Sequence, residues 1–464
     1  MSLTFEAEAR GLERAMLGDT SIIELVGTGG GRGARIGAST MDVTLGPDGG
    51  DVTALVARDD VRLELPDTAD GARQEIRAVT LTGTGAPETG LTAVRFDTQV
   101  EYRERRPATA AGGAATNRVI RAERLEAGVA AGLSAMPEAR FLGNVRFDDD
   151  TRQAAADQVE YDVTAGRVTL GLGGPAGVTP RLTDSTGTIE APSIEIALDG
   201  SAVDASGGVK SVLSQAGGGD EAGTGSTRPA LLDGDETIFV SADTLHYDGA
   251  AGETAYKGQA RLWQGETSFQ GDALTVDDQT GALTATGNVQ SSIQLLRLNE
   301  TTQQTELSLT RAEADTFTYD ETKHVATYDN KAVLRSEYGD LKANTIAVFL
   351  EPDGRTLDRL EATGDVKLHL EGRWASGDRL VYHEAEGRYD MEGAPVEIIE
   401  EVEPEETTEE IVPPRRGELP PKPSCRTTSG RALTFYRSTD TVSVDGREER
   451  RTWTDSGTCR PQTF

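Results

Sequence analysis

Apolar and polar residues alternate with a period of two along most of the chain. In residues 256–262 the tyrosine, glycine, alanine and leucine share one face, whereas Lys257, Gln259 and Arg261 share the other. The same alternation recurs in the pairs Leu245 and Tyr247, Leu274 and Val276, and Ile346 and Val348. Successive side chains of a strand point to opposite faces, so this pattern is typical of half-buried strands. The chain is therefore predicted to be all-β.

Short glycine-containing turns separate these alternating runs. Glycine supplies the positive φ that hairpin loops need, so each turn predicts a hairpin of antiparallel strands. The turns are residues 47–49, 162–166, 278–281, 352–354 and 384–387.

Two short phrases repeat along the chain. A strand-and-turn phrase of the form Ala-Asp-x-x-x-Tyr-Asp occupies residues 156–162, 242–248 and 314–320, with weaker copies at 377–382 and 430–435. A second phrase, glycine then Asn or Asp then valine, begins at Gly143, Gly287 and Gly364. We expect this second phrase to open a strand after a hairpin.

The longest internal match joins the two ends of the chain. Residues 38–65 align without a gap over residues 343–370, with 13 identities in 28 positions. Self-similarity of this kind marks repeated supersecondary units. The N-terminal region is therefore predicted to be built from the same unit as the C-terminal region.

Two segments interrupt the repeats and predict the domain organisation. Residues 213–235 are small, polar and glycine-rich, which is typical of a flexible linker. They would separate an N-terminal body at 1–212 from a C-terminal body at 236–464. Residues of about 397–424 are acidic and then proline-rich, and proline cannot donate to a ladder, so this insertion is expected to leave the sheet.

Charge and composition exclude some classes of protein. A net charge of -32 would repel nucleic acid, so no nucleic-acid partner is expected. No run approaches the roughly 18 apolar residues of a membrane span. No cationic stretch followed by an apolar core begins at Met1, so the chain is either cytoplasmic or lacks its start. The two cysteines, Cys425 and Cys459, are either a disulfide in an oxidising compartment or two unrelated thiols.

Catalytic and metal-binding motifs are not found in the sequence. The chain has no nucleophile elbow, phosphate-binding loop or zinc-protease motif, and its four histidines are scattered singly. The repeated aspartates Asp157, Asp243, Asp315 and Asp378 are expected to be solvated turn residues, each just before a strand, because none has a second ligand at fixed spacing. We expect no enzyme activity, no metal and no cofactor.

The inward-facing apolar positions leave two interpretations open. They form either a filled β core or an open apolar trough that accommodates acyl chains, with polar head groups at the rim. The candidate groove residues are Leu245, Tyr247, Tyr256, Leu262, Leu274, Val276, Phe317, Tyr319, Tyr328, Leu334, Ile346, Val348 and Leu368.

The order of the phrases carries a family resemblance. Ala-Asp-Thr-Leu-His-Tyr-Asp at 242–248, Tyr-Lys-Gly at 256–258, Gly-Asp-Ala-Leu-Thr-Val at 271–276 and Leu-Thr-Ala-Thr-Gly-Asn-Val at 283–289 follow one another. This order resembles the periplasmic bridge proteins of lipopolysaccharide export, the organic-solvent-tolerance A-like family. The resemblance covers residues of about 236–396 and extends by the internal repeat over roughly 30–210.

The resemblance implies a fold, a function and partners. The expected fold is two tandem open antiparallel β-jelly-roll bodies built from repeated hairpin units. The N-terminal body is either a C-type component or a first A-type unit, and the C-terminal body is an A-type component. The expected function is a periplasmic bridge that shields lipid A acyl chains between the inner and outer membranes. Lipopolysaccharide and other transport components, stacked end to end through edge strands, are the expected partners, and a periplasmic location implies a truncated start. The alternative is a secreted repeat-β structural or adhesive protein with a filled core.

Overall fold

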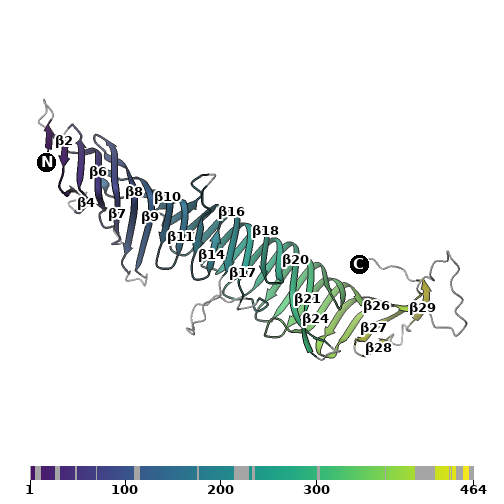
Figure 1. The fold of residues 1–464 in the computed structure, drawn as a ribbon. Coiled ribbons are helices and arrows are strands. Elements are labelled where there is room, and N and C mark those ends of the chain that lie inside the picture. Colours follow the sequence, from purple (N-terminus) through teal and green to yellow (C-terminus); the bar gives the residue numbers. More distant parts are fainter. Residues whose placement is uncertain are drawn as a thin grey trace, which may run out of the picture. The chain divides into compact units, whose positions relative to one another are not determined.

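A computed structural model describes most of the chain. The described residues are 2–5, 12–26, 32–47, 50–68, 71–108, 115–174, 177–213, 229–232, 236–299, 304–370, 372–402, 424–437, 439, 441–445 and 453–458. In these ranges the regular structure is β-strand, apart from two single turns of 3-10 helix (Figure 1). The all-β prediction is confirmed.

The chain divides into two compact units. Unit 1 comprises Met1–Ala216 with Asp243–Ala250, and unit 2 comprises Gly217–Ala242 with Ala251–Phe464. Asp243–Ala250 was expected in the C-terminal body but groups with unit 1, because Gly249 N donates to Ser201 O at 2.9 Å and His246 lies 2.7 Å from Asp204. The predicted boundaries at residues 212 and 236 otherwise stay a prediction.

Unit 1 consists of short N-terminal strands followed by longer ones. Its elements are β1 (Ser2–Phe5), β2 (Leu12–Leu17), β3 (Ser21–Val26), β4 (Arg32–Ala38), β5 (Thr40–Leu45), β6 (Val52–Glu64), β7 (Arg73–Ala86), β8 (Gly90–Arg106), β9 (Thr116–Gly128), η2 (Ala131–Leu133), β10 (Glu138–Asp148), β11 (Gln153–Asp162), β12 (Arg167–Gly171), β13 (Arg181–Thr183), β14 (Gly187–Glu190), β15 (Ser193–Ala197) and β16 (Ala202–Leu213).

Strand β17 (Ile238–Asp248) contributes residues to both units, and the remaining elements belong to unit 2. These are β18 (Glu253–Gln264), β19 (Thr267–Asp277), β20 (Leu283–Asn299), β21 (Gln304–Asp320), β22 (Val325–Ser336), β23 (Gly339–Leu350), β24 (Leu357–Leu370), β25 (Arg373–His383), η3 (Glu384–Glu386), β26 (Arg388–Val402), β27 (Ser424–Tyr436), β28 (Thr441–Asp445) and β29 (Trp453–Thr458).

Successive strands of unit 2 pair as antiparallel hairpins. From β18 to β27 each strand pairs with the next along the chain. The predicted turns at residues 278–281, 352–354 and 384–387 join β19 to β20, β23 to β24 and β25 to β26. The insertion expected from residue 397 begins later, because β26 continues to Val402 through its pairing with β27.

The phrase of glycine, Asn or Asp, and valine was expected to open strands, and this prediction is wrong. It lies in the middle of β10, β20 and β24, where it forms a β-bulge: Gly287 and Asn288, for example, have φ of 75° and 50°. Glycine, asparagine and aspartate tolerate this left-handed conformation better than other residues. The same double positive φ recurs at Asp59–Asp60, Thr98–Gln99, Gly143–Asn144, Gly258–Gln259, Asn330–Lys331 and Gly364–Asp365.

These bulges bend the strands while keeping one face apolar. In β6 the buried residues Ala57 and Val61 lie four positions apart across the bulge, whereas in β7 the buried Ala78 and Leu81 lie three apart. A bulge adds a residue to one strand and increases its twist and bend. Each bulged strand therefore supplies apolar side chains from both of its halves to one interior.

The repeated aspartates also differ from their predicted placement. Asp157, Asp243, Asp315 and Asp378 lie within β11, β17, β21 and β25, not in turns before strands. Several accept hydrogen bonds across the sheet: Val178 N donates to Asp157 at 2.7 Å and Ala394 N donates to Asp378 at 3.2 Å. Asp315 likewise accepts a hydrogen bond from Lys331 at 3.3 Å, so three of these four aspartates bind donors on neighbouring segments.

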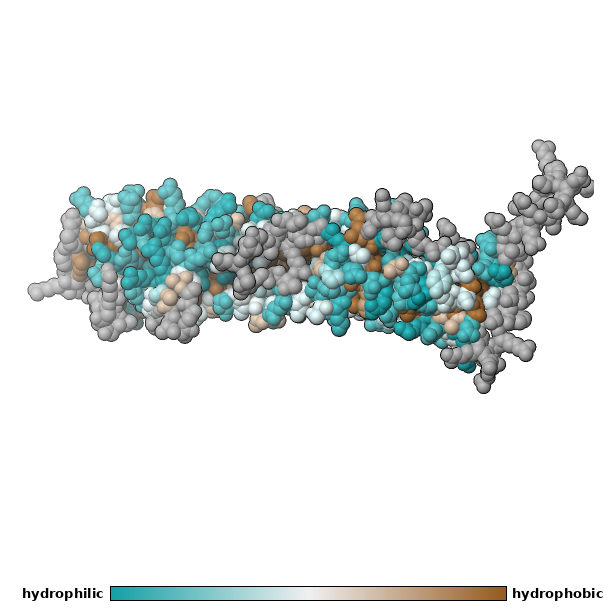
Figure 2. All heavy atoms as spheres, turned by 90° about the horizontal axis from the view of Figure 1, so that it is seen from below, coloured by the Kyte–Doolittle hydropathy of each residue, from teal (hydrophilic) through white to brown (hydrophobic). Residues whose placement is uncertain are grey.

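Part of the predicted linker packs onto unit 2. Leu231 and Leu232 are buried, and Ala230 N donates to the carboxylate of Glu321 at 2.7 Å. The outer surface is largely hydrophilic with small separate hydrophobic areas on the face shown in Figure 2. The apolar side chains of both units therefore point mainly to their interiors.

Candidate functional site

A two-stranded arm extends from the sheet of unit 2. Strand β20 pairs with β19 only as far as Ser292, and β21 pairs with β22 only from Arg311, so residues 293–299 and 304–310 pair with each other and leave the neighbouring strands. We call these residues the arm. Strands β20 and β21 are 17 residues long, compared with 11 or 12 in β18, β19, β22 and β23.

The arm crosses the apolar face of the sheet. We use "edge" here for a row of strand ends with their turns. The arm begins at the edge that carries the turn between Ser336 and Gly339, since Arg311 pairs with Arg335. Farther along, Leu296 N donates to Arg355 O at 2.8 Å and Leu296 forms a parallel bridge with Thr356. Arg355 and Thr356 belong to the turn between β23 and β24 at the opposite edge. The arm therefore spans the interior from one edge to the other.

A buried ion pair joins the arm to a second turn at that opposite edge. The Nη2 and Nε atoms of Arg297 donate to Oε2 of Glu384 at 2.9 and 3.2 Å, and each side chain is only 7% exposed. The Arg297 guanidinium also lies over the rings of Tyr338 and Tyr382, at 4.1 and 5.4 Å from their centroids. Burial lowers the pKa of Arg297, but the charges of Glu384 and the tyrosines outweigh it and raise that pKa overall. Arg297 is therefore a fixed cation at the rim of an apolar interior.

An apolar hollow lies under the arm. It is a cavity of about 50 Å³, or about 510 Å³ when its solvent-open mouth is included. Nine aliphatic residues and three tyrosines dominate its wall. The lining residues are Leu295, Arg297, Thr310, Leu334, Ser336, Tyr338, Gly339, Asp340, Leu341, Val348, Leu357, Leu360, Leu368, Leu370, Leu380, Tyr382 and Tyr389.

The structure brings together only some of the candidate groove residues in this hollow. Leu334, Val348 and Leu368 line it. Tyr247 and Val276 are half-buried, and Leu245 is buried in unit 1. The others are buried elsewhere in unit 2: Tyr256, Leu262, Leu274, Phe317, Tyr319, Tyr328 and Ile346.

An aromatic cluster fills the interior beside the hollow. The ring of Phe317 lies 4.9 Å from the rings of both Phe269 and Tyr328, and the Tyr328 hydroxyl is 2.7 Å from the Ser291 hydroxyl. Burial raises the pKa of Tyr328, so this hydroxyl stays protonated at neutral pH. At this level the candidate positions form a packed core.

Sequence reasoning missed the arm and its polar contacts. Arg297 and Glu384 are 87 positions apart, and neither belongs to a repeated phrase. The available signal was length, because the strands on either side of residues 300–303 are longer than their neighbours.

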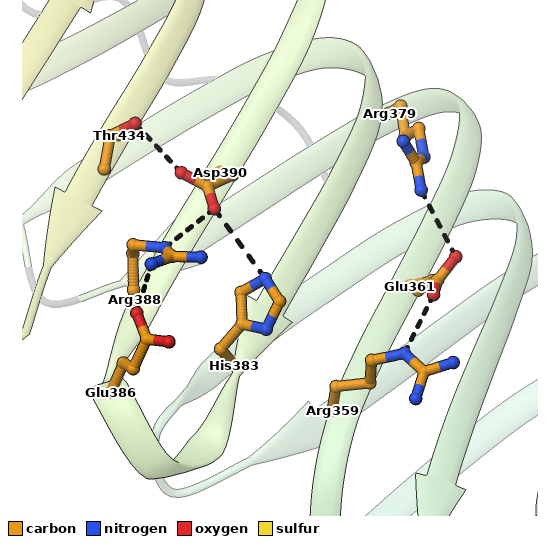
Figure 3. A network of polar contacts seen from close by, with 8 residues as sticks. All are labelled: Arg359, Glu361, Arg379, His383, Glu386, Arg388, Asp390 and Thr434. Atoms are coloured by element: carbon orange, nitrogen blue, oxygen red, sulfur yellow. Dashed lines mark hydrogen bonds and ion pairs between the residues drawn. The ribbon is translucent and has the colours of Figure 1, made fainter.

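The outer face of unit 2 carries a ladder of charges (Figure 3). Glu361 accepts hydrogen bonds from Arg359 at 3.0 Å and Arg379 at 3.5 Å, and the hydrogen bond from Arg359 lowers the pKa of Glu361. Asp390 accepts from Arg388 at 2.8 Å and from Thr434 at 2.9 Å. These half-exposed pairs are typical of a solvated sheet surface and add little stability each.

Unit 1 also has a buried polar cluster. The carboxylate of Glu104, 1% exposed, accepts hydrogen bonds from the hydroxyls of Tyr102 at 3.0 Å and Tyr161 at 2.5 Å, and it pairs with Arg106 and Arg118. Burial and the nearby Glu104 charge raise the pKa of both tyrosines.

A separate hollow of about 920 Å³ in unit 1 is lined by charged residues, among them Arg95, Arg140 and Arg167 with Glu126, Glu138 and Glu160. Charged walls are unsuited to acyl chains, so the hollow under the arm is the better apolar candidate.

The remaining candidates are placed as follows. Cys425 is buried and disulfide-bonded, whereas Cys459 lies outside the described residues, so the predicted pair stays a prediction. Over the described ranges, no group of three or more His, Cys, Asp or Glu side chains is arranged to hold a metal ion. Within the same part of the chain no helix is sufficiently long and apolar to span a membrane.

A family model matches part of unit 2. Residues 311–403 match the model described as LptA/(LptD N-terminal domain) LPS transport protein. This stretch is therefore similar to lipopolysaccharide-transport proteins. It includes β22 to β26 and all but three of the residues that line the hollow. The three outside it are Leu295, Arg297 and Thr310.

One solved structure is also similar. It is LptH from Pseudomonas aeruginosa, described as the LptA homologous periplasmic component of the conserved lipopolysaccharide transport device. The identity is 19%, the match covers 28% of this chain and 81% of that chain, and the TM-score is 0.22. Among curated proteins, none matches this chain.

Proposed function

We infer that this protein is a periplasmic component of lipopolysaccharide transport that shields lipid A acyl chains from water. One observation carries the inference: the segment that matches the lipopolysaccharide-transport model, residues 311–403, supplies most of the wall of the apolar hollow. Removing an acyl chain from water is favourable by about 0.8 kcal/mol per methylene, so even partial insertion stabilises a bound lipid.

Transport would be passive. Lipid would advance because another transport component supplies the energy. Partner components would join through the edge strands of each unit, whose unpaired backbone groups are suited to pairing with another sheet. The two units would act as a C-type and an A-type component in one chain.

In-cell photo-crosslinking tests this function. A photoreactive residue at Leu368, which lines the hollow, is compared with one at Thr363, which is exposed on the same strand. Lipopolysaccharide adducts at position 368 and not at 363 are expected. No adduct at position 368 in a folded and exported protein would contradict the transport function.

A second candidate is the structural or adhesive surface protein with a filled core. The small cavity of about 50 Å³ and the packed Phe269, Phe317 and Tyr328 rings favour it. A water molecule needs roughly 10–15 Å³ of such a cavity, so 50 Å³ holds only a few groups of the size of a water molecule. Lipid binding therefore requires that the hollow opens, and the absence of adducts at Leu368 would support the filled core.

A further inference from the structure

The arm is the part of unit 2 whose interior contacts are least apolar. Its buried side chains include Ile293 and Leu295, but also Arg297, Ser308 and Thr310. The neighbouring strands bury almost only aliphatic and aromatic residues toward the same interior. Because polar side chains gain less from burial, the arm is held with less hydrophobic energy than the strands beneath it.

Specific contacts hold the arm in place instead. These are the Leu296–Arg355 backbone hydrogen bond, the adjacent bridge to Thr356 and the ion pair between Arg297 and Glu384. These three connect the arm to turns at the opposite edge, and Arg297 also lies over Tyr338 in the turn where the arm begins. Separating these contacts would release the arm over the hollow without breaking the sheet.

One residue that lines the hollow has a buried hydroxyl without a hydrogen-bond partner. Tyr382 lines the hollow and is 2% exposed, and within the described part of the chain its hydroxyl oxygen is buried and has no hydrogen-bond partner. A buried hydroxyl without a partner is unfavourable and is rare in native structures. Burial, with the adjacent Tyr389, raises the pKa of Tyr382, so the hydroxyl remains a protonated donor at neutral pH.

We propose that the hollow is a binding site for an acyl chain bearing a neutral oxygen acceptor, that the Tyr382 hydroxyl donates a hydrogen bond to this oxygen, and that the arm is the cover that opens to admit the chain. The proposal rests on the transport function above and identifies the ligand chemistry of its site. Ester and amide carbonyls and chain hydroxyls are acceptors of this class.

The charge of the site favours a neutral acceptor over a phosphate. Among the described residues that line the hollow, Arg297 is the single cation; it is already paired with Glu384 at 2.9 Å, and Asp340 also lines the hollow. A phosphate here would compete with Glu384 for Arg297 and would lie near Asp340, so its charge would be poorly compensated in a partly dry site. An ester oxygen needs only a donor, and Tyr382 supplies one.

Two fluorescent probes test the hydrogen bond in the full chain. The methyl ester of cis-parinaric acid carries the acceptor, whereas 1,6-diphenylhexatriene is an apolar probe without oxygen. Tyr382→Phe removes only the hydroxyl, and it is expected to lower affinity for the ester about three- to ten-fold while leaving the hydrocarbon unaffected. Unchanged ester affinity, or an equal loss for both probes, would overturn the role of Tyr382.

A matched variant separates binding from stability. Tyr328→Phe also removes one buried hydroxyl, but this hydroxyl bonds to Ser291 and lies outside the lining of the hollow. It should reduce stability and leave ester binding unchanged. Tyr382→Phe should leave stability unchanged or raise it, because no protein hydrogen bond is lost. A stability loss as large as that of Tyr328→Phe would contradict the unpartnered state of Tyr382.

A reversible lock tests the cover. Leu296 and Thr356 are bridge partners, so their Cα atoms lie within the range of about 4.4–6.8 Å that a disulfide spans. The variant L296C/T356C should bind the ester probe more than about ten-fold more slowly when oxidised than when reduced, and the native chain under both conditions is the control. Equal rates in the two states would show that the arm is not the cover.

The results also distinguish this site from the transport function. Lipopolysaccharide adducts at Leu368 that persist in Tyr382→Phe, together with unchanged ester affinity, would retain transport and reject the proposed hydrogen bond. Failure of the native chain to bind either probe would reject the acyl site itself.

Discussion

The ion pair between Arg297 and Glu384 should make a large contribution to the stability of unit 2 when only one partner is removed. Both side chains are 7% exposed, so Arg297→Met leaves the Glu384 carboxylate in a site that water hardly reaches. Removing one partner of a buried ion pair costs about 3–5 kcal/mol. Glu384→Leu leaves the guanidinium, which retains its positions over Tyr338 and Tyr382, so the loss should be somewhat smaller, about 2–4 kcal/mol.

The double variant should recover most of the loss. Replacing both members of a buried ion pair by apolar residues of similar volume is often neutral, so R297M/E384L is expected within about 1 kcal/mol of the native chain. The two single losses then sum to far more than the double loss, which gives a coupling energy of about 3 kcal/mol or more.

Urea unfolding followed by tryptophan fluorescence measures these values. The three tryptophans, Trp263, Trp374 and Trp453, all belong to unit 2, so their emission reports this unit even though the whole chain does not unfold in two states. A loss below about 1 kcal/mol in Arg297→Met, or additive single losses, would refute a buried and coupled pair.

Three further measurements examine the rest of the fold. Gly364→Ala should lower the melting temperature, since φ is 77° and the new Cβ would lie 2.5 Å from a neighbouring side chain, whereas Gly128→Ala, with no atom within 4 Å, should leave it unchanged. Glu361→Gln should cost under about 1 kcal/mol at pH 7, measured by urea unfolding. Arg359 lowers the pKa of Glu361, so the stability that this carboxylate contributes is present above its unfolded pKa and is lost as pH falls through its folded pKa. Urea unfolding curves of the native chain and the variant that stay apart at pH 2 would contradict this. Glu104→Ala should destabilise unit 1 by about 3–5 kcal/mol. Urea unfolding followed by the near-ultraviolet circular dichroism of the tyrosines measures this loss. A change below about 1 kcal/mol would show that the Glu104 carboxylate does not stabilise the buried cluster of tyrosines and arginines.

The strands and hairpins were predictable because their causes are local. Alternation fixes which residues of 256–262 face inward, and turn glycines mark where hairpins reverse. The bulges were misjudged because a left-handed residue pair such as Gly287–Asn288 has the same composition as a turn. The distinguishing signal is the spacing of buried residues on either side, four positions in β6 and three in β7.

The candidate site depended on contacts between distant positions. The alternation identified Leu334, Val348 and Leu368 as inward residues, and they line the hollow. It identified Tyr256 and Phe317 as inward too, although these lie in the packed core. A period of two tells which face of the sheet a residue is on, but not where along the interior it lies. Whether an inward residue lines a hollow or a packed cluster depends on what lies opposite. In unit 2 that difference is made by the arm.

The internal repeat lets the covered hollow of unit 2 be compared with the related region of unit 1. Residues 38–65 and 343–370 share their bulge at equivalent positions, Asp59–Asp60 and Gly364–Asp365, so the two regions bend alike. In unit 2 the lengthening of β20 and β21 places Arg297 against Glu384 and encloses the apolar wall around Tyr382. A repeated hairpin fold thus gains a covered hollow through one longer hairpin, without altering the strands beneath it.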